Sequence, residues 1–272
     1  MHGLHARLPR NFVLEERLER YADAIELEPA RLAGRWADAC TPIGSTPFRE
    51  VRLDVGCGKG AFLTASAAAE PDVLLIGLDG EPVCIVYSAQ HIIEEGLSNA
   101  LVIPGLGDDL VRFFTPGELA GITINFPTPY PRKKEASKRL VALERLLEYR
   151  SLLADGAQIT FKTDHEPLFA FALTQFELAG YVLDYVGDDY RADFPDTPKS
   201  EYEERLVAQG AQVHALIAHA GPLEGTPVQT ASLSLVDYLP DDLHGLSYVP
   251  YGMQGTVVNL RNRRDHEAMR LS

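Results

Sequence analysis

From residue 51 onward, short apolar runs alternate with longer helical patterns. Strands are predicted at 51–55, 73–78, 100–103, 121–125, 157–162, 181–186 and 213–219. Helices are predicted between them, at 61–69, 82–95, 137–153 and 167–178. Regular alternation of this kind is typical of an α/β fold in which helices cover both faces of a mostly parallel sheet. The sequence therefore predicts a Rossmann-like domain with a seven-stranded sheet.

Two flanking segments differ from this pattern. Residues 12–40 predict one or two short helices, and 41–48 form a proline- and glycine-containing linker. After residue 221, alternation at 228–236 and an apolar run at 255–260 predict strands. We therefore expect an N-terminal helical segment at 1–48, a central domain at 49–221 and a β-rich C-terminal extension at 222–272.

Composition excludes several classes of protein. Hydrophobic residues make up 46% of the chain, but no apolar run approaches the roughly 20 residues needed to span a membrane. The N-terminus lacks the apolar region of a signal peptide. The three cysteines show neither metal-ligand nor disulfide spacing. We therefore expect a cytoplasmic protein with reduced thiols, no metal and no membrane partner; the sequence specifies no oligomeric state.

The net charge of −14 argues against a broad nucleic-acid surface, because phosphate contacts supply most non-specific affinity. Positive charge is nevertheless clustered at 132–139 and at 261–264. A nucleic-acid partner would have to bind through these clusters. The alternative interpretation is that they are solvated helix faces.

A glycine-rich segment, Asp54-Val-Gly-Cys-Gly-Lys-Gly60, follows the first predicted strand. Glycines let the backbone turn sharply and approach a ligand closely. Their G-x-G-x-G spacing differs from the G-x-G-x-x-G of dinucleotide sites. Asp54 is suited to accept hydrogen bonds from an ammonium group, and Asp79, at the end of the second strand, to bind ribose hydroxyls. This combination resembles Rossmann-type methyltransferases that use S-adenosylmethionine.

A second distinctive segment, Asn125-Phe-Pro-Thr-Pro-Tyr-Pro-Arg-Lys-Lys134, follows the fourth predicted strand. Its three prolines hold the backbone extended and leave few free donors. Tyr130 is suited to stack on a base, and the basic run after it to grip phosphates. The alternative is a proline-stiffened surface loop.

This loop resembles the Asn-Phe-Pro-Asp-Pro-Trp-Pro-Lys-Lys hallmark of the bacterial tRNA (guanine-N7-)-methyltransferases. Two further segments agree: Lys162-Thr-Asp164 is similar to the family's Ala-Thr-Asp, and Ser200-Glu-Tyr-Glu203 to its Thr-x-Tyr-Glu. The resemblance covers residues 50–220. It implies transfer of a methyl group from S-adenosylmethionine to N7 of a guanosine in the variable loop of tRNA.

The resemblance also implies roles for individual residues. The implied cofactor-binding residues are Asp54, Gly56, Gly58, Gly60, Asp79 and Asn125. The implied substrate-binding residues are Pro127, Tyr130, Arg132, Lys133, Lys134, Lys138, Arg139, Thr163, Ser200 and Tyr202. The candidates for catalysis are Asp164, Glu203 and Thr128.

Departures from the family pattern leave alternatives open. Thr128 stands where the family's loop has an acid, and Leu106 where a second acid is expected, although Asp108 or Asp109 is a possible substitute. Guanine N7 attacks through an in-plane lone pair, so no metal or obligatory base is needed. The alternatives are a methyltransferase of another substrate, an impaired homologue that binds S-adenosylmethionine or tRNA, and an interaction module built on an enzyme fold.

Overall fold

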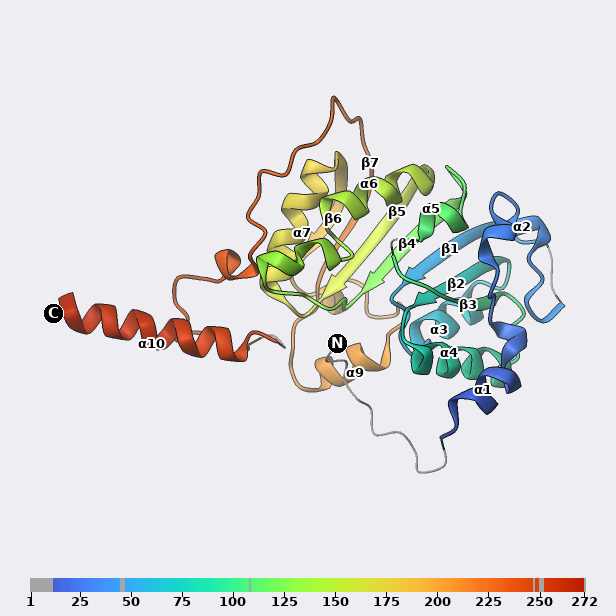
Figure 1. The fold of residues 1–272 in the computed structure, drawn as a ribbon, viewed down its shortest axis with the longest axis horizontal. Coiled ribbons are helices and arrows are strands. Elements are labelled where there is room, and N and C mark those ends of the chain that lie inside the picture. Colours follow the sequence, from blue (N-terminus) through green and yellow to red (C-terminus); the bar gives the residue numbers. More distant parts are fainter. Residues whose placement is uncertain (1–11, 45–46, 108, 247, 250–251, 272) are drawn as a thin grey trace.

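The computed structural model describes residues 12–44, 47–107, 109–246, 248–249 and 252–271 (Figure 1). Its N-terminal part contains the predicted short helices: α1 (Leu14–Arg20), α2 (Trp36–Ala39) and three 3-10 turns at 22–24, 29–32 and 42–44. Trp36 is fully buried, and its indole N–H donates to the carbonyl oxygen of Phe113 at 2.8 Å. This contact anchors the N-terminal segment to the central domain.

One seven-stranded sheet forms the centre of the molecule, with the strand order β3-β2-β1-β4-β5-β7-β6. Its strands are β1 (Glu50–Val55), β2 (Val73–Asp79), β3 (Ala100–Pro104), β4 (Leu119–Asn125), β5 (Leu153–Thr163), β6 (Tyr181–Gly187) and β7 (His214–Ala220). The first five pair in parallel, whereas β7 runs antiparallel to both β5 and β6. The predicted mostly parallel α/β sheet is confirmed.

Side chains of alternate strand residues enter two separate cores, as the pleat of a strand requires. On β2, Leu74 and Ile76 belong to the larger core, whereas Val73 and Leu75 belong to the smaller one. The larger core is covered by α5 (Leu110–Phe113), α6 (Leu143–Leu152) and α7 (Glu166–Leu178), and the smaller one by α3 (Ala61–Ala69) and α4 (Pro82–Glu94). Burial on both faces explains why these strands read as continuous apolar runs.

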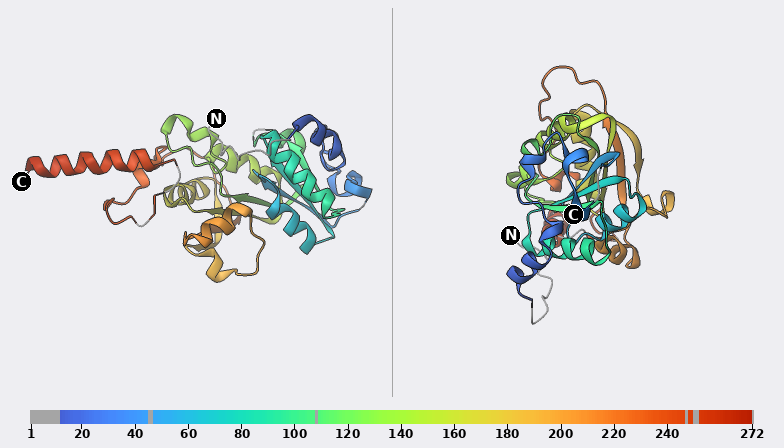
Figure 2. Two further views of the ribbon diagram at one scale, coloured as in Figure 1. Left: turned by 90° about the horizontal axis from the view of Figure 1, so that it is seen from below. Right: turned by 90° about the vertical axis from the view of Figure 1, so that its right-hand side faces the viewer.

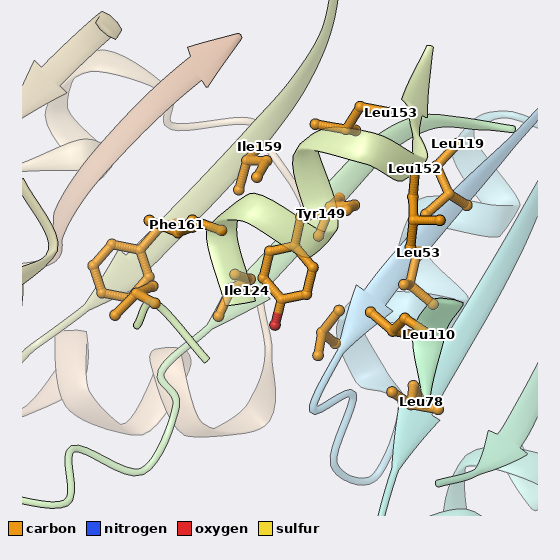
Figure 3. Packing of buried hydrophobic residues seen from close by; sticks show 14 of the residues in the cluster. Leu53, Leu78, Leu110, Leu119, Ile124, Tyr149, Leu152, Leu153, Ile159 and Phe161 are labelled. Carbon is orange, nitrogen blue, oxygen red and sulfur yellow. The ribbon is translucent and has the colours of Figure 1, made fainter. Parts of the chain in front are cut away.

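The larger core fixes the central strands relative to one another. Tyr149 and Leu152 of α6 lie over Leu53 of β1 and Ile124 of β4 (Figure 3). Each of these side chains is at most 1% exposed. Full burial of an apolar side chain of this size stabilises a fold by about 1.5–3 kcal/mol. The carboxyl ends of β1, β2, β4 and β5 are therefore held in a defined arrangement.

The long helix predicted at 137–153 is only partly correct. The structure has a 3-10 helix at Lys133–Lys138, extended backbone at Arg139 and Ala142, and the α-helix only from Leu143. The interruption follows from the Arg139 side chain, which turns into the protein and bonds to carbonyl oxygens of the proline loop. Tertiary contacts here override the helical pattern.

The prediction of a β-rich extension is wrong for the described residues after 221, which contain a 3-10 helix, Leu235–Tyr238, and helix α10, Gln254–Leu271. Val228, in the first predicted strand, is 69% exposed and does not join a sheet. In the second, Val257 is fully buried, four residues after the equally buried Met253, a spacing that suits a helix. Helix α10 extends away from the central domain in Figures 1 and 2.

No helix in the described ranges combines the length and the apolar character required to cross a membrane. The remaining helices, α8 (Tyr190–Asp193) and α9 (Glu201–Ala208), lie between β6 and β7 in the sequence. Both helices contribute side chains to the site at the ends of the strands.

Candidate active site

The glycine segment links β1 to α3 through three residues with left-handed backbone. The φ angles of Gly56, Gly58 and Gly60 are 78°, 57° and 86°. A Cβ atom on Gly60 would lie 2.9 Å from the Cα atom of Ser88, so the loop packs tightly against α4 there. A Cβ atom on Gly58 would meet no protein atom within 4 Å. Gly60 thus supports the fold, while Gly58 leaves open space beside the loop.

Asp79, at the end of β2, holds this loop in place. Its carboxylate accepts hydrogen bonds from the backbone N–H of Gly58 at 2.9 Å and of Glu81 at 2.8 Å. Burial raises the pKa of Asp79, although these two N–H donors oppose the shift. Each carboxylate oxygen retains a second lone pair, because an ionised carboxylate has about four acceptor positions. The residue predicted to bind ribose therefore also shapes the glycine loop.

Asp54 and Asn125 lie side by side on the neighbouring strands β1 and β4. The Asn125 Nδ2 donates to Asp54 Oδ1 at 3.4 Å, and Asp54 is 2% exposed. Burial raises the pKa of Asp54 to about 7, against the opposing effect of the Lys162 ammonium. No described residue donates to the buried Oδ1 of Asn125.

This pair provides a carboxylate and an unpartnered amide oxygen beside an open glycine turn. Buried acceptors are normally hydrogen-bonded, so the free Asn125 oxygen indicates a ligand donor. The ammonium and carboxylate ends of an amino acid, as in S-adenosylmethionine, fit such a group of acceptors and backbone N–H donors. No cluster of three or more metal-ligating side chains occurs within the part of the chain that the structure describes.

A buried group of charges lies beyond β5. Lys162 Nζ donates to Glu203 Oε2 at 3.1 Å, and the Arg191 guanidinium donates to the other oxygen of Glu203. Lys162 is 2% exposed and Glu203 is fully buried. Desolvation lowers the pKa of Lys162, and the Glu203 carboxylate opposes this shift. Buried charges are tolerated when they are paired in this way.

The position of Glu203 changes its predicted role. Each of its oxygens accepts a hydrogen bond from a cation, and the side chain is fully buried, so Glu203 is not accessible to an acceptor base. Ser200, predicted to bind substrate, caps α9 by accepting the backbone N–H of Glu203 at 3.1 Å. The resemblance indicated Glu203 but carried no sign of the two cations that neutralise it. We therefore treat Glu203 as a structural centre of the site.

The proline loop begins and ends in strained backbone. Phe126 and Tyr130 both have left-handed φ angles, 48° and 45°, which non-glycine residues adopt at a cost of about 1–3 kcal/mol. The Phe126 N–H donates to the Lys162 carbonyl oxygen at 2.8 Å, and its ring packs edge-on against Tyr202. Strain of this kind persists only where surrounding contacts determine the conformation.

Arg139 is the main support of the loop. Its Nε donates to the Pro129 carbonyl at 3.1 Å, and its Nη2 donates to the carbonyls of Tyr130 at 2.8 Å and Leu233 at 2.9 Å. The side chain is 1% exposed and stacks on Phe171 at 4.4 Å. Burial lowers the pKa of Arg139 to about 10, so it stays charged at neutral pH. This corrects its predicted role, because a buried guanidinium cannot reach RNA phosphates.

The other predicted cations remain at the surface. Lys133, Lys134 and Lys138 are exposed on the 3-10 helix that follows the loop, and so is Arg132 just before it. Lys138 Nζ lies 5.6 Å from the centre of the Tyr130 ring. Cations and an aromatic ring thus occur together on one face, as single-stranded nucleic-acid sites require.

Two positions at which the family has an acid are occupied here by Thr128 and Leu106, and among the described residues we find no nearby acid that takes over either position. Thr128 is exposed at the tip of the proline loop, and Pro127 lies beside it, half-buried. Leu106 is 60% exposed after β3. Asp109 binds the Arg112 guanidinium at 3.1 Å, and Asp108 lies outside the described residues.

Asp164 follows β5 and borders a cavity of about 560 Å³. It is 8% exposed, and its Oδ2 accepts a hydrogen bond from the Tyr248 hydroxyl at 2.6 Å. Thr163 is buried beside it and accepts the His165 N–H at 3.1 Å, which turns the chain into α7. No pattern in the sequence indicated that Tyr248, 84 residues away, reaches this acid.

Comparisons with known proteins agree with this geometry. The family model "Putative methyltransferase" matches residues 49–216. Curated tRNA (guanine-N(7)-)-methyltransferases from Geobacillus sp. (strain WCH70) and Streptococcus equi subsp. zooepidemicus are 32% and 31% identical to the chain. These matches cover 74% and 75% of this chain and 89% and 95% of the relatives.

Similar solved structures include the 16S rRNA methyltransferase KamB, with a TM-score of 0.51 and 16% identity over 64% of this chain and 89% of that one. A 16S rRNA (adenine(1408)-N(1))-methyltransferase from Catenulisporales acidiphilia has a TM-score of 0.50 and 16% identity over 72% and 95%. Likenesses at this identity show the fold.

The fold and the site define an S-adenosylmethionine-dependent methyltransferase with a Rossmann-like domain. The curated relatives, at 31–32% identity, are more similar to the chain than these solved structures and are matched over nearly their whole length, so they identify the family within this class. The chain belongs to the tRNA (guanine-N(7)-)-methyltransferase family.

Proposed function

We propose that this protein transfers the methyl group of S-adenosylmethionine to N7 of a guanosine in the variable loop of tRNA. The observation that carries the proposal is the position of the strained proline loop, which follows β4 between the cofactor acceptors on β1 and Asp164 on β5. A tRNA substrate places the reaction in the cytoplasm. The matched relatives, named for this reaction, support the proposal.

The cofactor half of the site would bind S-adenosylmethionine through its two polar ends. Asp54 and the free oxygen of Asn125 suit the ammonium group, and Asp79 retains lone pairs for ribose hydroxyls. Gly58, which lacks a protein neighbour at its Cβ position, lets the backbone approach the cofactor. When bound, the cofactor supplies an electrophilic methyl group on a sulfonium.

In the transfer, the N7 lone pair of guanine forms the new C–N bond as the methyl–sulfur bond breaks, so no proton has to leave. The products are S-adenosylhomocysteine and a cationic 7-methylguanosine. Orientation of the two reactants can contribute about 7–11 kcal/mol to such a reaction. A carboxylate near the purine stabilises the positive charge that develops on it.

Asp164 is the acid best placed for this task. Thr128 carries no charge, and Glu203 is neutralised by Lys162 and Arg191. Among the residues that the structure describes, only the neutral Tyr248 hydroxyl donates to the Asp164 carboxylate, which also borders the cavity. We propose that Asp164 binds the N–H donors of the guanine edge.

Tyr130 and the exposed cations would hold the RNA around the acceptor base. Tyr130 offers a ring on which a base can stack, and stacking of this kind contributes about 1–3 kcal/mol per base. The ammonium groups of Lys133, Lys134 and Lys138 would neutralise phosphates. Replacing any one of them should reduce the slope of log binding constant against log salt concentration by about one. A local cluster suffices here despite the overall negative charge of the chain.

The test is methylation of unmodified tRNA by the purified protein, followed by mass spectrometry of the nucleosides. We expect S-adenosylmethionine-dependent formation of 7-methylguanosine, lost when the acceptor guanosine is replaced by 7-deazaguanosine. Asp164→Asn should lower kcat about 10- to 100-fold, because hydrogen bonds to a charged group contribute about 1.5–3 kcal/mol. The control, Thr128→Ala, should change kcat less than about threefold. Methylation of another nucleoside alone would contradict the proposal.

Thr128 and Leu106 favour a second candidate, a homologue that binds the cofactor and tRNA without efficient transfer. This candidate predicts thermal stabilisation by S-adenosylhomocysteine and salt-dependent tRNA binding, with no 7-methylguanosine formed. The same assay therefore separates the two candidates. Formation of product at many turnovers per protein molecule would exclude the second.

A further inference from the structure

The segment after residue 221 returns to the substrate half of the site, although the family match ends at residue 216. The Leu235 N–H donates to the Pro131 carbonyl at 3.1 Å, and the Leu233 carbonyl accepts from Arg139. Leu235 is fully buried in the larger core. The extension is thus built into the support of the proline loop.

The same segment forms one side of the cavity at Asp164. Leu239, Pro240, Leu246 and Tyr248 line it together with residues of the central domain. Figure 1 shows this part of the chain, between β7 and α10, passing beside α7. Without these side chains, the cavity would be open on that side.

The other side of the cavity is polar and acidic. Asp164, Glu166 and Asp188 contribute carboxylates, and His214 binds Asp188 through Nδ1 at 3.1 Å. Such a lining suits a group that carries N–H donors and acquires positive charge, as a guanine does when it is methylated at N7. An apolar wall on one side and carboxylates on the other suit a flat base with a polar edge.

We propose that the extension completes the acceptor-base pocket and that Tyr248 is a positioning residue, which orients the Asp164 carboxylate toward the base. This inference rests on the function proposed above. It assigns a role in that function to a part of the chain that lies outside the family match.

The hydrogen bond between the two residues supports this role. The Tyr248 hydroxyl is 2.6 Å from Asp164 Oδ2, a distance typical of a hydroxyl that donates to an ionised acceptor. Burial and the bond to Asp164 raise the pKa of Tyr248, so the hydroxyl keeps its proton throughout the neutral range. Oδ2 retains one lone pair and Oδ1 both, which leaves acceptors for two N–H groups of a guanine edge.

The experiment compares Tyr248→Phe with the unaltered full-length protein. The substitution removes one hydroxyl and keeps the ring. We expect kcat for tRNA methylation to fall about tenfold, because one hydrogen bond to a charged group is lost. The midpoint of thermal unfolding and the affinity for S-adenosylhomocysteine should stay unchanged, since the tyrosine ring still covers the cavity.

A matched control lies in the same extension. The Tyr238 hydroxyl donates to the Ser232 carbonyl at 2.9 Å and does not line the cavity. Tyr238→Phe should leave kcat unchanged. A double-mutant cycle then tests the mechanism: in the Asp164→Ala background, Tyr248→Phe should have no further effect, because its acceptor is absent.

Several results would overturn the inference. Unchanged kcat in Tyr248→Phe, or equal losses with and without Asp164, would show that the hydroxyl does not act through this acid. An increased kcat would show that Tyr248 blocks the pocket. If the unaltered protein forms no 7-methylguanosine, the proposed function fails separately. Tyr248 is then judged by tRNA affinity with S-adenosylhomocysteine bound, where unchanged affinity in Tyr248→Phe refutes the pocket.

Discussion

The two halves of the site are held together over very different distances along the chain. In the cofactor half, Asp79 binds the backbone of Gly58, which lies 21 residues earlier in the same strand–helix–strand unit. In the substrate half, Arg139 binds Leu233 across 94 residues, and Asp164 binds Tyr248 across 84. The glycine turn of the cofactor half is therefore a local structure, although Asn125 reaches Asp54 across 71 residues. The two long-range supports of the substrate half span still longer stretches of the chain.

The two halves also use charge differently. Backbone N–H groups hold the cofactor-side carboxylate of Asp79, while guanidinium and ammonium groups hold the substrate side. A local backbone turn tolerates sequence change around it, but a buried cation requires its partner.

The largest expected effect tests the buried charges of the substrate half. Glu203→Gln leaves Lys162 and Arg191 without their shared carboxylate, so we expect a loss of about 3–5 kcal/mol in the free energy of unfolding. The measurement is urea denaturation followed by circular dichroism. Glu204→Gln, at an exposed neighbouring position, should cost less than about 0.5 kcal/mol. Equal costs would show that the buried group does not support the fold.

The next effect separates two functions within the glycine loop. Gly60→Ala should destabilise the protein by about 2–4 kcal/mol, because left-handed strain adds to a clash with Ser88. Gly58→Ala should cost only about 1–2 kcal/mol from strain, since its Cβ meets open space. It should nevertheless weaken S-adenosylhomocysteine binding by calorimetry. Tight cofactor binding by a stable Gly58→Ala protein would place the cofactor elsewhere.

A third change affects the substrate half alone. Arg139→Lys keeps the charge but loses the planar fork that holds three carbonyl oxygens. We expect kcat/KM for tRNA to fall about tenfold or more, because a loop displaced by about 1 Å can cost two orders of magnitude. Cofactor affinity should not change. Lys138→Gln, next to it at the surface, should weaken tRNA binding without altering kcat; equal behaviour of the two variants would contradict the loop-support role.

The smallest effect is a pH dependence of the cofactor half. Burial raises the pKa of Asp54 to about 7 in the folded protein, above the value of about 4 of an exposed aspartate, so the folded state binds an extra proton between these values. Its contribution to stability is thus fully present below about pH 4 and is lost as pH rises through 7. Cofactor affinity should instead increase as pH rises through 7, because an ammonium group binds the ionised carboxylate more tightly than the protonated one.

The measurement for Asp54 is calorimetric titration with S-adenosylhomocysteine between pH 5.5 and 8.5, in buffers of different ionisation enthalpy. Below the pKa, affinity should fall by up to about tenfold per pH unit. Near neutral pH, binding of S-adenosylhomocysteine should release a proton from Asp54. Asp54→Asn should remove most of this dependence. A flat profile in the unaltered protein would mean that Asp54 does not titrate against the cofactor.

Much of the architecture was predictable because its determinants are local. Apolar runs and their spacing marked all seven strands. The pattern is clearest in β2 and β3, because strands buried on both faces leave an unbroken hydrophobic run. The glycine loop and the proline loop were also recognisable from local sequence. Glycine widens the range of allowed backbone angles and proline narrows it, wherever they occur in a chain. Motif resemblance then indicated the family and the candidate acids.

The extension was predicted poorly because its structure is determined by what it packs against. Period-two alternation at 228–236 is too weak a signal to specify a strand, and the segment instead buries Leu235 in the larger core. The run at 255–260 lies in helix α10, where Val257 is buried in the larger core together with Met253, the residue just before the helix.

The sequence by itself determined the sheet, the glycine turn and the family, because each depends on residues close together in the chain. Only the tertiary structure decided which predicted residues are available for chemistry. It places Lys162 and Arg191 on Glu203, buries Arg139 beneath the proline loop and brings Tyr248 to Asp164. Charges and hydrogen bonds act over a few ångströms in space, and no pattern in the sequence specifies which distant side chains will meet at that range.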